Sequence, residues 1–159
     1  MEVSARPGRA DDAPWVAEAA QGAAARIQRQ RGGALFLSRD HAPLPPADLW
    51  IAALDDADSI AAIGEIDGVP VGFAIFRVDA LPDGQLLGVV QDLFVVEDAR
   101  TVGVGEALID FGIDWGGPGL LGWDATALPG DRHTKNFFES HGFKARSLTL
   151  HRSAASPNT

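Results

Sequence analysis

The chain has 159 residues, of which 46% are hydrophobic and 22% are charged; this length suits one substantial core and is too short for two comfortable domains. Its formal net charge of −9 argues against a nucleic-acid-binding surface, which is normally basic, and is compatible with a cationic amine as substrate. The absence of cysteine excludes disulfides, thiolate metal sites and a cysteine nucleophile.

The first part of the chain predicts a short strand followed by a helix. Residues 1 to 9 lack the apolar core of a signal peptide, and no later apolar run approaches the length of a membrane span, so we expect a cytoplasmic protein with no membrane contact. A strand is predicted over 3 to 6, and Asp11-Asp12-Ala13-Pro14 indicates a helix N-terminus. Three arginines near the end of this helix are interpreted as favourable charges at a helix C-terminus, in preference to an anion site: Arg26, Arg29 and Arg31. The heavy use of alanine, glycine, aspartate and arginine is typical of a GC-rich bacterial genome.

The middle of the chain changes from a loop and a helix to strands. Residues 32 to 46 are loop-like, with a short apolar strand at 35 to 37, and a helix is predicted over 46 to 54. Five later runs are predicted as strands: 60 to 66, 71 to 78, 86 to 96, 119 to 125 and 145 to 152. Asp67-Gly68 is a strong hairpin signal, and Pro82-Asp83-Gly84 turns the chain again. This order predicts a single α/β (α+β) domain over residues 1 to 152, with a mixed, mainly antiparallel sheet flanked by helices, and a flexible tail over 153 to 159.

The most informative segment runs from Gln91 to Asp110. An apolar run ends at Val96, and a glycine-containing loop leads into an amphipathic helix predicted over 103 to 115. The first N–H groups of a helix lack intrahelical partners and lie at the positive end of the helix dipole, so they can hold a phosphate. The segment is therefore predicted to form an anion cradle between a strand and a helix.

Two motifs carry a resemblance to a known family. Arg100-x-x-Gly103-x-Gly105, after a strand ending in Leu-Phe-Val-Val, resembles the Gln/Arg-x-x-Gly-x-Gly/Ala motif of the Gcn5-related N-acetyltransferase (GNAT) superfamily. Downstream, Phe138-Glu139-x-x-Gly142-Phe143 resembles the family's Tyr-Glu-x-x-Gly-Phe motif at the end of a helix, for which Asp131 is a plausible N-cap. The resemblance covers residues 86 to 143. It implies the acyl-coenzyme A (CoA) N-acyltransferase fold and transfer of an acetyl group from acetyl-CoA to a primary amine, by direct attack in a ternary complex.

The resemblance also implies which residues hold the donor. In the family, the glycine loop wraps the pyrophosphate of acetyl-CoA, and the backbone of a bulged, splayed strand binds the pantetheine arm. The cofactor-binding residues expected here are Phe94, Val95, Val96, Arg100, Thr101, Val102, Gly103, Val104, Gly105, Glu106, Asp131 and Phe138. Arg100 has two interpretations of equal weight, a phosphate contact or an ion pair with Glu97 or Asp98.

Asp92 is the first candidate catalytic residue. A carboxylate inside an otherwise apolar strand is costly to bury without a role or a partner, and several family members carry an acidic residue at this point. An unperturbed aspartate, with a pKa near ~3.9, is a poor base for an ammonium, so Asp92 would deprotonate the amine through ordered water or with a raised pKa. The alternative is that Asp92 binds a cationic substrate or pairs with a buried arginine.

The second motif departs from the family at Phe138. Many members place there a tyrosine that protonates the leaving thiolate, and this chain has no tyrosine. A thiol with a pKa near ~8.5 is a tolerable leaving group, so water could serve. His133, in the first turn of the predicted helix, is the candidate substitute, with a solvated surface histidine as the alternative reading.

Alternatives to an active transferase stay open at this stage. The loss of tyrosine is compatible with a catalytically impaired CoA-binding regulatory or structural module of the same fold. A nucleotide-binding domain is a more distant reading, because the loop lacks a Gly-Lys-Ser/Thr ending. The expected acceptor is a small-molecule or peptide amine that the sequence does not identify. No metal is expected. A homodimer, with a second copy of the chain as partner, is a further expectation.

Overall fold

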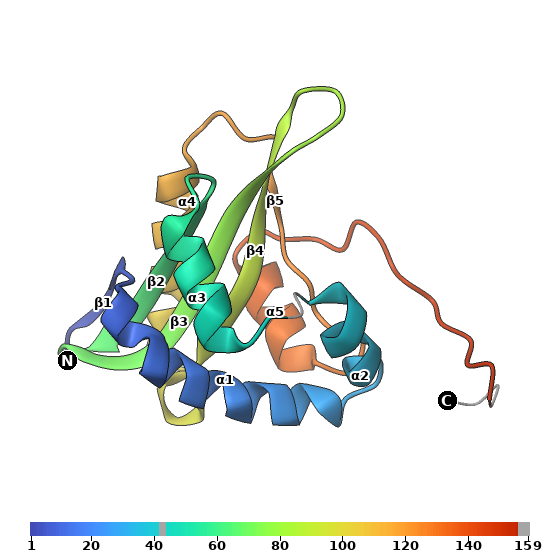
Figure 1. Cartoon of the computed structure of the whole chain (residues 1–159), viewed down its shortest axis with the longest axis horizontal. Helices are drawn as coiled ribbons and strands as arrows, with labels where there is room; N and C mark the ends of the chain where they lie inside the picture. Colours follow the sequence, from blue (N-terminus) through green and yellow to red (C-terminus); the bar gives the residue numbers. More distant parts are fainter. Residues whose placement is uncertain (42–43, 156–159) are drawn as a thin grey trace.

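The computed structural model describes residues 1–41 and 44–155. Its longer elements are β1 (Val3–Pro7), α1 (Ala13–Gln28), α2 (Gly33–Leu35), α3 (Pro46–Asp55), β2 (Ser59–Ile66), β3 (Val69–Ala80), β4 (Leu86–Val95), α4 (Val104–Gly116), β5 (Trp123–Asp124) and α5 (Arg132–Ser140) (Figure 1). Three short helical turns lie between them: η1 (Ala10–Asp12), η2 (Phe36–Asp40) and η3 (Glu97–Ala99). No helix among the described residues is long and apolar enough to cross a membrane.

The sheet is mixed and mainly antiparallel, as predicted. Its strand order is β1-β2-β3-β4-β5; the first four strands are antiparallel neighbours, and β5 runs parallel to β4. The predicted hairpin between β2 and β3 is confirmed, because Asp67 and Gly68 both have positive φ, at 50° and 80°, which a two-residue hairpin turn requires.

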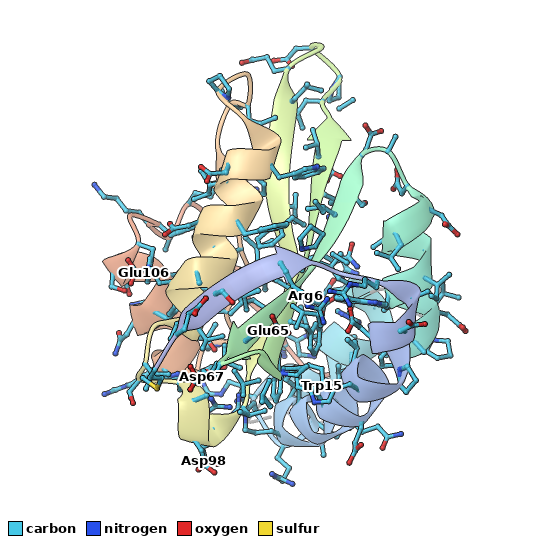
Figure 2. The ribbon with its side chains drawn as sticks, turned by 90° about the vertical axis from the view of Figure 1, so that its left-hand side faces the viewer. Arg6, Trp15, Glu65, Asp67, Asp98 and Glu106 are labelled. Atoms are coloured by element: carbon cyan, nitrogen blue, oxygen red, sulfur yellow. The ribbon has the colours of Figure 1, made fainter. Side chains whose placement is uncertain are left out.

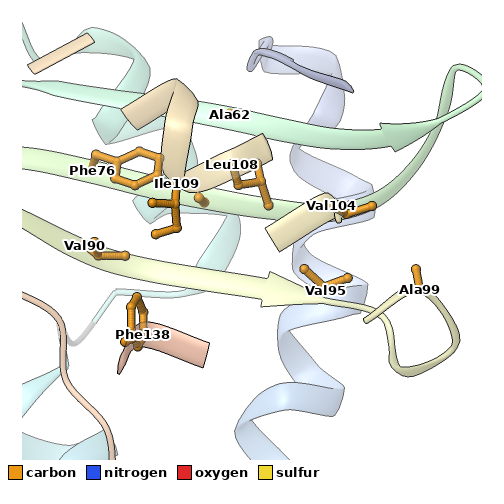
Figure 3. Packing of buried hydrophobic residues seen from close by; sticks show 10 residues of the cluster. Ala62, Phe76, Val90, Val95, Ala99, Val104, Leu108, Ile109 and Phe138 are labelled. Carbon is orange, nitrogen blue, oxygen red and sulfur yellow. The ribbon is translucent and has the colours of Figure 1, made fainter. Parts of the chain in front are cut away.

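Successive residues of the central strands face opposite sides of the sheet, as strand geometry demands. Ala74 and Phe76 of β3 pack on the side of α4, whereas Phe73 and Ile75 pack on the side of α1 and α3. Figure 2 shows α4 on one side of the sheet and α1 with α3 on the other. Figure 3 shows α4 packed over the sheet through residues that include Leu108 and Ile109.

An ion-pair network joins the N-terminal strand to its neighbours (Figure 2). Arg6 Nη2 lies 2.8 Å from Asp12 Oδ1, and Arg6 Nε lies 3.1 Å from Glu65 Oε2. Asp12 also accepts a hydrogen bond from the main-chain N–H of Arg9 at 2.8 Å. The hydrogen bond from Arg6 is the main cause that lowers the pKa of Asp12, and its partner carboxylates raise the pKa of Arg6. The network connects β1, η1 and β2.

Three predicted strands are wrong or too long. Residues 35 to 37 belong to the helical segments α2 and η2, because a short apolar run does not by itself distinguish a strand from a helix. Of the strand predicted over 119 to 125, only Trp123–Asp124 is regular. Residues 145 to 152 form no strand: alternation makes a strand only where a neighbour pairs with it, and Leu148 and Leu150 are 84% and 90% exposed.

The other predicted elements agree with the structure. The helix expected over 46 to 54 is α3, and the helix expected after the glycine loop is α4. The predicted loop over 32 to 46 includes positions 42 and 43, and the predicted tail includes positions 156 to 159; these positions lie outside the described residues.

Candidate active site

The candidate site forms where β4 and β5 separate. β5 pairs with the first part of β4, matching Gly88 with Trp123 and Val89 with Asp124. Within the described residues this pairing does not continue, while β4 stays paired with β3 as far as Val95. Main-chain groups on the β5 side of the second half of β4 therefore have no neighbouring strand among the residues that the structure describes, and such groups need another partner.

A β-bulge lies at the start of this open half. Ile75 of β3 pairs with Asp92, and Phe76 pairs with Val90, so Gln91 is the extra residue. A bulge bends the strand and re-aims the side chains that follow it. Asp92 is the first residue after the bulge, and its side chain is 23% exposed. The bulge thus accounts for a half-buried carboxylate in an apolar strand.

The glycine loop after β4 leads to the N-terminus of α4. Gly103 has a φ of +96°, in the left-handed region that favours glycine, and α4 begins at Val104. Thr101 and Glu106 are exposed, whereas Val104 is buried against the core. The first N–H groups of α4 lack intrahelical acceptors by the geometry of a helix, and they lie at the positive end of its dipole. This arrangement can hold an anion.

Two arginines from distant parts of the chain line the hollow beside this loop. Arg100 donates from Nε to the carbonyl of Val95 at 3.2 Å. Burial and the charge of Arg26 lower the pKa of Arg100, while Glu97 and Asp131 act in the opposite direction. Arg26 comes from α1, and its Nε is buried without a hydrogen-bond partner within the described part of the chain. The two guanidinium groups repel each other, and an anion bound in the hollow that both of them line would relieve the repulsion.

Helix α5 forms the other wall of the site. Asp131 caps it, as predicted, by accepting hydrogen bonds from Thr134 N at 3.1 Å and Thr134 Oγ1 at 2.7 Å. Burial raises the pKa of Asp131, but these bonds and the charge of Arg26 outweigh burial, so the pKa lies below its usual value. Phe138 is 8% exposed and packs against Phe143, with ring centroids 5.1 Å apart. Because both of its oxygen atoms accept hydrogen bonds from Thr134, the carboxylate of Asp131 serves as the N-cap of α5.

These elements enclose one groove. Its lining residues are Arg26, Leu93, Phe94, Val95, Arg100, Gly105, His133, Thr134, Phe137 and Phe138. Six of the residues selected from the sequence are among them: Phe94, Val95, Arg100, Gly105, His133 and Phe138. The other selected residues lie outside the lining: Asp92, Val96, Thr101, Val102, Gly103, Val104, Glu106 and Asp131.

A histidine that sequence reasoning missed pairs with Asp92. The Nε2 atom of His41 lies 2.8 Å from Asp92 Oδ1, although the two residues are 51 positions apart. The ring of His41 is tilted against that of Phe36, with centroids 6.0 Å apart. His41 follows η2, inside a stretch that the sequence predicts as a loop. No spacing motif connects it with β4, so the sequence carries no signal for this pair.

A comparison of the sequence with known protein families identifies the family of this chain. The sequence model of the acetyltransferase (GNAT) domain matches residues 47–145, which is more than half of the chain. The chain belongs to the GNAT acetyltransferase family. A comparison with curated protein sequences finds no match.

Solved structures confirm the acyl-CoA N-acyltransferase fold of this GNAT chain. A mutant form of the BH1408 protein from Bacillus halodurans superposes with a TM-score of 0.77 at 17% identity, over 96% of this chain and 99% of the other. Ribosomal-protein-alanine N-acetyltransferase from Brucella melitensis biovar Abortus 2308 gives 0.67 at 22% identity, over 96% and 99%. Aminoglycoside N-acetyltransferase AAC(6')-Iy, in complex with CoA, gives 0.72 at 17% identity, over 96% and 95%.

The other two histidines of this GNAT domain, His141 and His151, are not among the residues that line the groove. His141 Nδ1 lies 2.8 Å from the carbonyl of Phe137 at the end of α5. His151 borders a second, open hollow of about 670 Å³ beside α2 and η2. That hollow is larger than the groove but includes no residue of β4 in its lining.

Proposed function

We propose that this chain is an N-acetyltransferase that moves an acetyl group from acetyl-CoA to a primary amine by direct attack in a ternary complex. The observation that carries the proposal is the separation of β4 from β5 beyond Val89, beside a loop that ends at the N-terminus of α4. Membership of the GNAT acetyltransferase family indicates acetyl transfer as the class of reaction. The open main chain and the helix N-terminus supply a place for an extended donor that ends in phosphates.

The donor would lie with its phosphates at α4 and its thioester along β4. The main-chain N–H groups of residues 101 to 106 would hold the pyrophosphate, with Arg100 and Arg26 contributing positive charge. Main-chain groups of Phe94, Val95 and Val96 would bind the pantetheine arm and the thioester carbonyl. Gly105 and Phe138 would shape the groove around it, and Asp131 would act by fixing the first turn of α5.

The chemistry requires removal of a proton from the amine and delivery of one to the thiolate. Asp92 lies directly after the bulge on the strand that would carry the thioester, which supports a role in handling the amine. His133 lines the groove together with Phe138, and we propose that it donates the proton that a tyrosine gives in many relatives. Positioning of the two substrates would contribute much of the remaining acceleration.

The acceptor is proposed to be a small-molecule or peptide amine. A net charge of −9 favours a cationic acceptor by long-range attraction. The open hollow of about 670 Å³, lined by residues of α1, α2 and η2 and by His151, is a place where such an acceptor could bind. Since His41 directly follows η2, an amine held in the hollow would approach β4 along this segment.

We also propose that the chain forms a homodimer. Phe143 packs against Phe138, and Arg146 pairs with Asp124, but the chain then leaves the domain (Figure 1) with Leu148 and Leu150 84% and 90% exposed. Covering two such leucines is favourable by about 25 cal/mol per Å² of apolar surface, and a second copy would supply that cover. Sedimentation of the wild type against the double variant Leu148→Ser, Leu150→Ser tests this: a monomeric wild type would exclude the dimer.

The enzymatic proposal is tested by two measurements on the full chain. Calorimetric titration measures acetyl-CoA binding, and a thiol reagent measures CoA release in the presence of amino sugars, polyamines, amino acids and peptides. We expect binding and thiol release that depends on one amine class. Binding without turnover on any amine would instead support a CoA-binding regulatory or structural module. Tight ATP binding with no response to CoA would favour a nucleotide-binding domain.

Asp92→Asn tests the placement of the chemistry. We expect a lower kcat/KM with unchanged acetyl-CoA affinity, because the carboxylate lies outside the groove lining but on the strand that would carry the thioester. Asp110→Asn, at an exposed position of α4, is the matched control and should retain full activity. Unchanged turnover of Asp92→Asn would remove this residue from the mechanism.

A further inference from the structure

The pair formed by His41 and Asp92 combines two groups that the fold brings together from separate layers. His41 follows η2, and Asp92 lies on β4 after the bulge; their side chains are 21% and 23% exposed. The pair is thus reachable from solvent, yet shielded enough for its hydrogen bond of 2.8 Å to be stronger than in water.

We infer that His41 is the general base that takes the proton from the acceptor amine, and that Asp92 is a positioning residue that orients its ring. This inference rests on the proposed N-acetyltransferase function and replaces Asp92 as the direct base. General bases act best when their pKa lies near the operating pH. Imidazole, at about 6.5, meets this condition better than an aspartate at about 3.9. A carboxylate at hydrogen-bond distance also stabilises an imidazolium once it forms.

The proton balance of the reaction accommodates this assignment. The neutral imidazole of His41 takes one proton from the ammonium and becomes imidazolium beside Asp92. The amine lone pair then attacks the thioester carbonyl carbon, forming the C–N bond and a tetrahedral oxyanion. Collapse breaks the C–S bond, and the thiolate receives the second proton of the amine nitrogen, through His133 or water. The imidazolium finally releases its proton to solvent.

Other charged groups lie on the elements around the pair. On η2, Arg39 and Asp40 pair with each other at 3.4 Å and are both well exposed. Next to Asp92 on β4, Leu93 belongs to the lining of the groove, whose titratable and charged residues are Arg26, Arg100 and His133. The pH profile is therefore compared between variants.

The experiment uses the full chain with acetyl-CoA and the amine that the panel identifies. For His41→Ala we expect about a hundredfold lower kcat/KM, an unchanged dissociation constant for acetyl-CoA, and partial recovery of turnover on addition of free imidazole. The acidic limb of the kcat/KM profile should be lost in His41→Ala and displaced in Asp92→Asn. Arg39→Gln, on the same exposed turn, should leave the activity unchanged.

Each other result overturns a defined part of the argument. Wild-type-like kcat/KM for a folded His41→Ala overturns the inference while leaving the proposed function intact. A loss of activity with no recovery by imidazole and an unaltered acidic limb assigns His41 a structural role and also overturns it. A wild type that binds acetyl-CoA but acetylates no amine overturns the proposed function, and the assignment of a base falls with it. Circular dichroism melting of each variant confirms folding, and His41→Gln repeats the test if His41→Ala does not fold.

Discussion

The ring of Phe137 lies against Gly105 so closely that a Cβ atom on this glycine would come within 2.8 Å of the ring's Cε1 atom. The contact joins α5 to the first turn of α4, and both residues line the groove. The motif assigns Gly105 to the phosphate loop because a glycine lets a ligand approach the backbone. In this fold the space beside its Cα is already used by an aromatic ring, so the glycine is needed for packing as well.

We predict that Gly105→Ala loosens the junction of α4 and α5. The added methyl group must displace the Phe137 ring, and overpacking of this kind costs about 1–3 kcal/mol. The melting temperature and the affinity for acetyl-CoA should both fall. Gly130→Ala is the control, because nothing lies within 4 Å of its Cβ position, and it should change neither quantity. A Gly105→Ala variant as stable as wild type would show that the ring moves without cost.

Arg26 supplies the second prediction. Its Nε is buried without a partner in the described part of the chain, and its charge adds to burial in lowering the pKa of Arg100. A bound phosphate should therefore gain a charge-assisted hydrogen bond from Arg26. Such bonds contribute about 1.5–3 kcal/mol, which corresponds to a tenfold or larger loss of acetyl-CoA affinity in Arg26→Gln. The turnover number at saturating donor should change little.

Arg29→Gln is the matched control for Arg26, because it removes the same charge at an exposed position directly after the end of α1. Its effect on acetyl-CoA affinity should be small and should disappear in higher salt. Equal losses of acetyl-CoA affinity for the two variants would show that Arg26 acts only through the positive charge at the C-terminus of α1. That is the role that the sequence predicts for these arginines.

Features with their own local chemical signals could be predicted from the sequence. Asp131 caps α5 through Thr134, three residues away, and the Asp67-Gly68 turn lies between the strands that it joins. Gly142, with a φ of +89°, follows α5. In each case the residue type required by the backbone is also the residue that marks the position. The glycine loop before α4 belongs to the same class.

Features that depend on distant residues could not be predicted in this way. His41 meets Asp92 across 51 positions, and Arg26 reaches the groove from the first helix, so neither has a motif of fixed spacing. The strand predicted over 145 to 152 failed for the same reason: its alternating pattern is suitable, but pairing requires a neighbour. The described residues of one chain provide none for it.

We predict that His133→Gln lowers kcat by about tenfold to a hundredfold and leaves the KM for acetyl-CoA nearly unchanged. Removing a general acid costs up to ~10²–10⁴ in rate, and the moderate pKa of a thiol leaving group limits the loss. Steady-state kinetics with the identified amine measure the effect. Asn136→Ala, exposed on the same helix, should behave as wild type. A kcat for His133→Gln within twofold of wild type would leave water as the proton donor.

The network around Arg6 predicts how stability depends on pH. Because the bond from Arg6 lowers the folded-state pKa of Asp12 below its usual 3.8, the unfolded chain binds this proton more readily than the folded one. The stabilisation is therefore fully present above about pH 5 and is lost as the pH falls through the folded-state pKa, below 3.8. Asp12→Asn should lower the free energy of unfolding by about 1.5–3 kcal/mol at neutral pH, and this difference should shrink under acid. Urea unfolding at pH 7 and pH 3 measures it, with the exposed Asp11→Asn as control; a difference independent of pH would mean that the charge of Asp12 contributes nothing.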